Sequence, residues 1–133
     1  MQQRVIHVGV GSFGKRWCRE FLRANVDDAT IEVVALVDID PASLAYGARV
    51  LGLPDSACFT DAQKAFDTVP ADFCTVVVPP DHHEAIVDIA IAHGVDVLSE
   101  KPIVGIMEAS VRIAKKIKAA GRKMAVTMSY RFD

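Results

Sequence analysis

Short apolar runs alternate along the chain with segments in which apolar residues recur at helical spacing. The apolar runs occupy residues 4–10, 31–38, 73–79, 95–99 and 123–130. The run at 31–38 is apolar at nearly every position, which is typical of a strand that is covered on both faces. The runs therefore predict five strands of one parallel sheet.

The segments between these runs predict helices on both faces of that sheet. Their ranges are 12–24, 41–52, 61–68, 83–94 and 106–121. The last is the clearest, because its apolar positions fall on one side and its lysines on the other. The inward positions are Ile106, Ala109, Ile113 and Ile117. Residues 25–30 are polar and predict a loop. The expected fold class is α/β, with a Rossmann-type doubly wound parallel sheet.

A chain of 133 residues has the length of one ordinary domain, and it contains no internal repeat or linker. Hydrophobic residues make up 51% and charged residues 24%, a balance that supports a folded core. The expected organisation is a single domain over residues 1–133. The last predicted strand is followed almost at once by Asp133, without a helix to cover that edge of the sheet.

The charge pattern gives no indication of a nucleic-acid or membrane-surface partner. The formal net charge is −2, and the basic residues are scattered apart from a short cluster at 115–118. Cys18, Cys58 and Cys74 form no CxxC pair, which favours reduced thiols. The N-terminus has no signal-peptide pattern, and no apolar run approaches about 20 residues. We therefore expect a cytoplasmic protein.

The stretch GVGSFG follows the first predicted strand and opens the first predicted helix. It places Gly9, Gly11 and Gly14 in the G-x-G-x-x-G pattern of dinucleotide-binding sites. In that pattern the first glycine permits a tight turn, the second lets a pyrophosphate approach the backbone, and the third lets helix and strand pack closely. The N–H groups near Ser12 and Phe13 would face the phosphates at the positive end of the helix dipole.

Asp38 ends the second predicted strand, at about the distance from the glycine loop that a ribose-binding acid requires. A carboxylate there accepts hydrogen bonds from the adenosine ribose and repels a 2′-phosphate, so NAD is favoured over NADP. Asp40 is better placed than Asp38 to cap the helix that begins with Pro41. A methyltransferase that binds S-adenosylmethionine could use the same glycines and acid, so these residues alone leave the ligand open.

Two further segments reach the edge of the sheet where α/β folds bind ligands. In the first, Pro79 and Pro80 end a strand, and His82 and His83 begin a helix. Neighbouring residues at a helix start point in different directions, and no cysteine or carboxylate set completes a site, so we predict no metal. A histidine near the cofactor and a purely structural histidine both remain open.

The second segment is DVLSEKPIV, where a buried strand is followed by Glu100, Lys101 and Pro102. A lysine at this edge is suited to hydrogen-bond a substrate hydroxyl, or to move its proton, as hydride leaves the same carbon. We expect Lys101 to be partly buried and catalytic, with its direction set by Pro102. Glu100 is expected to offset its charge by pairing with it or with the backbone nearby.

Together these motifs resemble the Gfo/Idh/MocA family of oxidoreductases, the relatives of glucose–fructose oxidoreductase and inositol dehydrogenase. The resemblance runs from VIHVGVGSFG through VALVDIDP and VVVPPDHHEA to SEKP and SYRF. It implies a catalytic role for Lys101 and a cis peptide bond between Lys101 and Pro102. The cofactor contacts that it implies are Gly9, Gly11, Ser12, Phe13, Gly14, Asp38, Pro79, His83, Glu100 and Lys101.

The family reaction is hydride transfer between NAD(P) and a secondary alcohol, commonly of a sugar, polyol or diol. The resemblance also implies a second, α+β domain, absent from this chain, which supplies most of the substrate pocket and usually the oligomer interface. We therefore expect an NAD-binding domain over 1–133, truncated before the substrate domain and inactive by itself. The alternative is a free-standing nucleotide-binding or sensor module with a protein partner. The stretch 124–132 is expected to expose apolar area and to promote homo-oligomers or aggregates.

Overall fold

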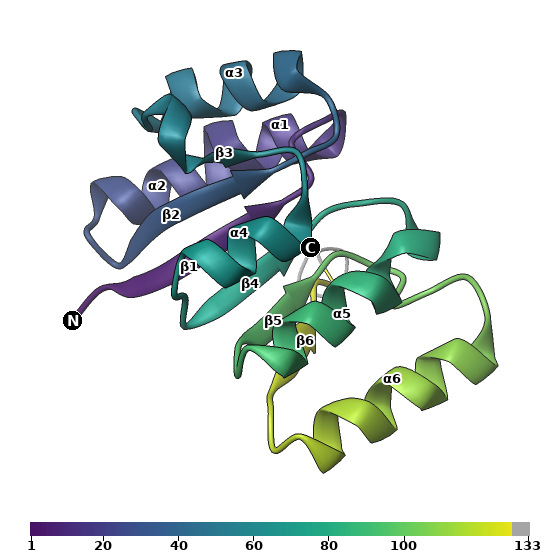
Figure 1. Cartoon of the computed structure of the whole chain (residues 1–133). Coiled ribbons are helices and arrows are strands. Elements are labelled where there is room, and N and C mark those ends of the chain that lie inside the picture. The colour runs from purple at the N-terminus through teal and green to yellow at the C-terminus, as the bar shows by residue number, and fades with distance from the viewer. Residues whose placement is uncertain (129–133) are drawn as a thin grey trace.

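Six parallel strands form one sheet in the computed structural model, which describes residues 1–128 (Figure 1). They are β1 (Gln3–Val8), β2 (Ile31–Val37), β3 (Cys58–Phe59), β4 (Phe73–Val76), β5 (Asp96–Ser99) and β6 (Met124–Val126). Their order across the sheet is β3-β2-β1-β4-β5-β6, so the direction of winding reverses between β1 and β4. Sheets with this order bind ligands at that point, outside the carboxyl ends of the strands.

Helices cover both faces of the sheet, and the predicted doubly wound α/β fold is confirmed. Figure 1 shows α1 (Phe13–Arg16), α2 (Arg23–Asp27) and α3 (Pro41–Leu51) on one face. The other face carries α4 (Ala62–Thr68), α5 (His83–Ala92) and α6 (Met107–Ala119). A π-helical segment, η1 (Trp17–Leu22), joins α1 to α2, and the 3-10 turns are η2 (Asp55–Ala57) and η3 (Pro80–His82).

The hydrophobic core has two layers, one on each face of the sheet. Val5 belongs to the first layer and Ile6 to the second, because successive side chains of a strand point to opposite faces. The helical side chains of the first layer are Trp17, Cys18, Leu22, Leu44, Ala48 and Leu51. Those of the second are Ala65, Phe66, Ile86, Val87, Ala90, Ile113 and Ile117. Burial on both faces explains why the strands read as apolar runs.

The structure differs from the sequence prediction in a few elements. The first helix continues to Asp27, into the stretch predicted as a loop. The strand β3 was not predicted, because two residues are too few to form a pattern, and it exists through its pairing with β2. Ile106 is 60% exposed rather than buried, since it precedes α6 as its N-cap. Of the predicted last strand 123–130, β6 covers Met124–Val126, and residues 129–130 lie outside the described residues.

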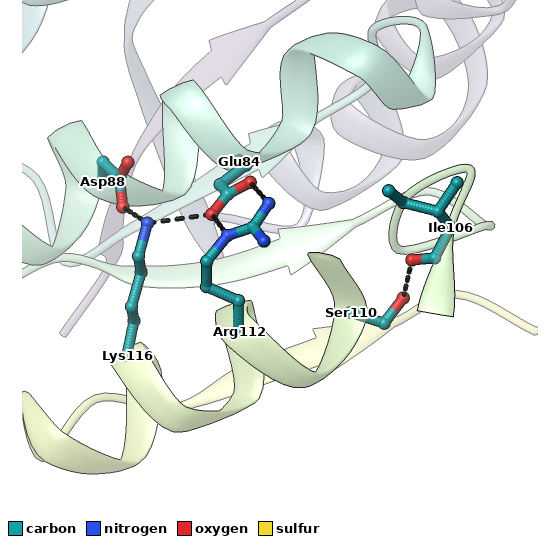
Figure 2. A network of polar contacts seen from close by, with 6 residues as sticks. All are labelled: Glu84, Asp88, Ile106, Ser110, Arg112 and Lys116. Carbon is teal, nitrogen blue, oxygen red and sulfur yellow. Dashed lines mark hydrogen bonds and ion pairs between the residues drawn. The ribbon is translucent and has the colours of Figure 1, made fainter. Parts of the chain in front are cut away.

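A charged network ties α6 to α5, as Figure 2 shows. The Arg112 guanidinium donates to both carboxylate oxygens of Glu84, at 2.6 and 2.7 Å. Lys116 donates to Glu84 and to Asp88, each at 2.9 Å. The two cations lower the pKa of Glu84 to about 2. The same helix begins with a bond from Ser110 Oγ to the Ile106 carbonyl at 3.3 Å (Figure 2).

Candidate functional site

The turn after β1 requires glycine at two of its three motif positions. Gly9 has a φ of +98°, and a Cβ there would lie 2.0 Å from the carbonyl oxygen of Val77. A Cβ on Gly14 would lie 2.1 Å from the carbonyl oxygen of Gly9. Both separations are far below van der Waals contact, so the tight turn and the close packing of helix on strand both depend on these glycines.

Gly11 differs, because no protein atom in the described part of the chain crowds it. A Cβ there would make only ordinary contacts, at 3.8 Å to Ser43 Oγ and 3.9 Å to Asp38 Oδ2. The next residue, Ser12, is exposed and has a φ of 45°. Among residues 1–128, no protein acceptor is recorded for the N–H groups of Ser12 and Phe13. The open space at Gly11 and these N–H groups fit a pyrophosphate at the start of the helix.

Asp38 holds the glycine loop from the neighbouring strand. Its Oδ2 accepts hydrogen bonds from the N–H groups of Val10 and Gly11, at 2.7 and 3.1 Å. Its Oδ1 accepts from the Asp40 N–H at 2.9 Å. The expected helix cap is confirmed, because Asp40 accepts from Ala42 N at 3.1 Å and caps α3. The sequence prediction missed the bond between Asp38 and the loop, although both follow strands that proved to be adjacent.

At the exit of β4, His83 is fully buried and joins two segments of the chain. Its Nε2 lies 2.7 Å from the Val78 carbonyl oxygen, and its Nδ1 lies 2.7 Å from the Ile103 carbonyl oxygen. His83 thus connects the turn that contains Pro79 to the segment after Lys101. Its predicted contact with a cofactor stays a prediction.

His82 is exposed, and it does not join His83 in a metal site. Within residues 1–128, no group of three or more His, Cys, Asp or Glu side chains is placed to hold a metal ion. The same part of the chain contains no helix that is long and apolar enough to span a bilayer.

The exit of β5 carries Glu100 and Lys101. The expected partial burial of Lys101 is wrong: its side chain is exposed, because burial decreases from Ser99 through Glu100 as the chain leaves β5. Glu100 Oε2 accepts from the Lys101 backbone N–H at 3.2 Å, which is the backbone pairing that was expected. Glu100 Oε1 accepts from the Trp17 indole N–H at 3.0 Å. The Lys101–Pro102 peptide bond is cis, as the family resemblance implied.

The sheet topology brings the predicted site residues to one edge. The glycine loop follows β1, Asp38 follows β2, Pro79 follows β4, and Glu100 and Lys101 follow β5. The order β2-β1-β4-β5 therefore places the glycine loop in the middle, with the acid on one side and the lysine on the other. A dinucleotide that lies across this edge would have its phosphates between the two.

The sequence did not single out His7 and Trp17, two buried residues behind this edge. His7 is fully buried, and its Nδ1 lies 2.6 Å from Thr75 Oγ1. Its ring stacks on Trp17, with centroids 6.1 Å apart and an angle of 21° between the planes. Burial lowers the pKa of His7 to about 4, so this imidazole is neutral at pH 7. A histidine inside a strand of apolar residues was the signal that could have identified it.

A hollow of about 250 Å³ lies away from these residues. It is lined by residues 66–71, at the end of α4 and in the loop that leads to β4, and by His93 and Val95 before β5. These segments meet the amino ends of the strands, which is the edge opposite the glycine loop. His93 Nε2 there lies 2.8 Å from Asp67 Oδ1. The hollow is therefore separate from the candidate site.

Sequence comparison relates almost the whole chain to known proteins. Residues 3–131 match a family described as "Oxidoreductase family, NAD-binding Rossmann fold". The chain is 58% identical over 133 residues to the uncharacterized protein y4oX of Sinorhizobium fredii, which covers 100% of the chain and 37% of that protein. It is 32% identical over 131 residues to inositol 2-dehydrogenase of Pseudarthrobacter chlorophenolicus. That match covers 98% of this chain and 37% of the dehydrogenase. The chain thus spans 37% of the length of both relatives.

Solved structures agree with the fold. The myo-inositol 2-dehydrogenase of Lactobacillus plantarum superposes with a TM-score of 0.87 at 23% identity, over 100% of this chain and 38% of that one. The scyllo-inositol dehydrogenase of Lactobacillus casei with bound NAD(H) and scyllo-inositol gives a TM-score of 0.84 at 24% identity, with the same coverage. At these identities the likeness concerns the fold alone. The match over residues 3–131, on a sheet of this order, shows that the chain belongs to the Gfo/Idh/MocA oxidoreductase family.

Proposed function

We propose that residues 1–133 are the cofactor-binding domain of an NAD-dependent oxidoreductase that transfers hydride to or from a secondary alcohol of a sugar, polyol or diol. The observation that carries the proposal is the meeting of the glycine loop, Asp38 and Lys101 at one edge of a sheet wound in the order β3-β2-β1-β4-β5-β6. Relatives named inositol 2-dehydrogenase support a polyol substrate. Because the chain spans 37% of their length, we assign most substrate contacts to a second domain.

The pyrophosphate of NAD would lie against the open backbone at Gly11 and the N–H groups of Ser12 and Phe13. Asp38 would face the adenosine ribose. Its carboxylate already accepts three backbone N–H groups, but two oxygens offer about four lone-pair sites, which leaves room for a ribose hydroxyl. A 2′-phosphate would meet this charge and that of Asp40, so NAD is favoured over NADP. Membership of an oxidoreductase family also favours a dinucleotide over S-adenosylmethionine.

The catalytic role is assigned to Lys101. NAD, when bound, accepts the hydride from the alcohol carbon. The Lys101 amine would hydrogen-bond the alcohol oxygen and take its proton, and in the reverse direction the ammonium would return a proton to the new alkoxide. The side chain is exposed at the ligand edge, and no ion pair among residues 1–128 includes it. It is thus available to a substrate that a second domain presents.

Calorimetry of the 133-residue chain with NAD and NADP tests the cofactor assignment. We expect NAD to bind weakly, because only one side of the site is present, and to bind more tightly than NADP. A chain that is folded by circular dichroism but binds neither cofactor would refute the proposal. Tighter binding of NADP would overturn only the role of Asp38.

Kinetics of the domain joined to a substrate domain test the role of Lys101, with myo-inositol as the first probe. Lys101→Met should lower kcat by about 10²- to 10⁴-fold, with the affinity for NAD nearly unchanged. Lys64→Met, which removes an exposed lysine of α4, is the matched control. An unchanged kcat in Lys101→Met would remove the catalytic assignment.

A further inference from the structure

Trp17 links the first helix to the residue that precedes the catalytic lysine. It begins η1, is 5% exposed, and donates its indole N–H to Glu100 Oε1 at 3.0 Å. The other oxygen of Glu100 accepts from the Lys101 backbone N–H at 3.2 Å. Both carboxylate oxygens are thus occupied by donors that are not the Lys101 amine.

The direction of the indole N–H is fixed by packing against the sheet. One face of the Trp17 ring stacks on His7, and Phe21 packs edge-on at 5.3 Å between centroids. His7 in turn is held by Thr75 Oγ1 at 2.6 Å, on the adjacent strand β4. The indole therefore cannot turn its donor away from Glu100 without disturbing a buried histidine and a core layer.

This arrangement has a consequence for the charge beside Lys101. Glu100 and Lys101 are sequence neighbours at a half-exposed site, so an unrestrained carboxylate could reach the lysine ammonium. A carboxylate there would hold the ammonium in its charged form, and a charged amine cannot accept the proton of an alcohol. The indole bond is a charge-assisted hydrogen bond, which is strong enough to keep the carboxylate in place.

We propose that Trp17 is a positioning residue: its indole N–H holds the Glu100 carboxylate away from the Lys101 amine and thereby keeps this amine free to exchange a proton with the substrate. The proposal rests on the proposed catalytic role of Lys101. Its structural part, the effect of Trp17 on the Lys101 amine through Glu100, is testable without cofactor or substrate.

The test is the rate at which Lys101 is acetylated in the 133-residue chain, measured by mass spectrometry, with Lys15 and Lys64 as internal references. Trp17→Phe keeps an aromatic ring on His7 and removes the donor. We expect Lys101 acetylation to become about 3- to 10-fold slower, because the released carboxylate pairs with the ammonium. In a Glu100→Gln background the same substitution should have no further effect, because the neutral amide cannot form that ion pair.

Asn25→Ala is the matched control, since it removes an exposed side-chain N–H donor of α2 that bonds the Phe21 carbonyl and not Glu100. We expect the wild-type acetylation rate from it. The chain contains a single tryptophan, so one indole N–H resonance reports the bond directly. That resonance should shift and exchange faster with solvent in Glu100→Ala. If Trp17→Phe does not fold, benzothienylalanine at position 17 keeps the shape of the ring and lacks the N–H.

An unchanged Lys101 rate in the folded variant would overturn the proposal. So would an equal slowing in the Glu100→Gln background, because the effect would then not act through the carboxylate. Calorimetry with NAD separates this result from the proposed function. A chain that binds NAD but shows no dependence on Trp17 refutes only the positioning role, and a chain that shows the dependence but binds no NAD refutes only the proposed function.

Discussion

At the scale of single residues, His7 makes the stability of the domain sensitive to mild acid. Its pKa is about 4 in the folded chain, against an ordinary value of 6.5. Between these values the unfolded chain binds more protons than the folded one. The contribution of His7 to stability is therefore complete above pH 6.5 and decreases as the pH falls towards 4, by up to about 3 kcal/mol.

Urea unfolding at pH 7.5 and pH 4.5 measures this effect. His7→Phe should lose less stability between the two pH values than wild type, because the titrating group is gone. His82→Phe, which replaces an exposed histidine, should behave like wild type. The same acid dependence in His7→Phe and wild type would show that another group is responsible.

The glycines of the loop divide into structural and ligand-facing positions, and two alanine substitutions separate them. Gly14→Ala places a Cβ 2.1 Å from a backbone oxygen and should destabilise the chain by at least about 3 kcal/mol, or prevent folding. Gly11→Ala meets only ordinary contacts, so stability should stay within about 1 kcal/mol of wild type. The added methyl group would occupy the path of the pyrophosphate, and NAD affinity should fall by at least about 10-fold.

Urea unfolding and NAD calorimetry on the two variants provide the measurements. Wild-type NAD affinity in Gly11→Ala would contradict the placement of the phosphates. A Gly14→Ala variant as stable as wild type would contradict the geometry of the turn.

At the scale of elements, the network between α5 and α6 predicts a pH-dependent attachment of α6. The pKa of Glu84 is lowered from 4.5 to about 2, chiefly by hydrogen bonds from Arg112 and Lys116. Because folding lowers the pKa of Glu84, the network stabilises the fold fully above pH 4.5. Its contribution is lost as the pH falls through about 2. Because the groups are partly exposed, the contribution is screened by salt.

Glu84→Gln should lower Tm by a few degrees at pH 7 and low salt, and the difference from wild type should shrink near pH 2 or at 1 M salt. Glu32→Gln removes the same charge from an exposed position on β2 and serves as the control. Calorimetric melting curves give the comparison. Equal Tm values for Glu84→Gln and wild type at pH 7 would show that apolar packing alone holds α6.

The elements also show where sequence patterns are reliable. The apolar runs identified β1, β2, β4 and β5, because strands buried on both faces must be apolar along most of their length. The face of α6 followed from its spacing at Ala109, Ile113 and Ile117. The prediction that Ile106 is buried was wrong, because a residue at the helix N-cap does not point in the direction of the helical face. The two-residue β3 exists only through its neighbour β2.

At the scale of the whole molecule, exposed apolar side chains on α6 and after β6 predict association in solution. Met107 on α6 is 74% exposed and Met128, after the edge strand β6, is 56% exposed. The sequence placed such a surface at 124–132, of which residues 129–132 lie outside the described residues. An edge strand with apolar neighbours tends to find partners.

Sedimentation over a range of concentrations should therefore show a rising average mass for the 133-residue chain. Met107→Lys combined with Met128→Lys should reduce this rise in average mass. The control Lys64→Met, at an exposed position on α4, should not reduce it. A clean monomer at high concentration would contradict the prediction.

The sequence by itself determined the α/β class, the glycine turn, the N-cap at Asp40 and the approach of Lys101 to the ligand edge. These features follow from local rules: the burial of strands, the φ of a glycine, the reach of a capping carboxylate and the chain direction at a strand end. Only the tertiary structure decided three contacts. Asp38 accepts hydrogen bonds from the glycine loop, and the Trp17 indole donates to Glu100. The His83 ring lies within hydrogen-bond distance of two backbone carbonyl oxygens. Trp17 and Glu100 are 83 positions apart, and their contact exists because the strand order brings the exits of β1 and β5 to the same edge. Local sequence patterns do not predict a contact between residues so far apart in the chain, because the strand order of the whole sheet decides which residues meet.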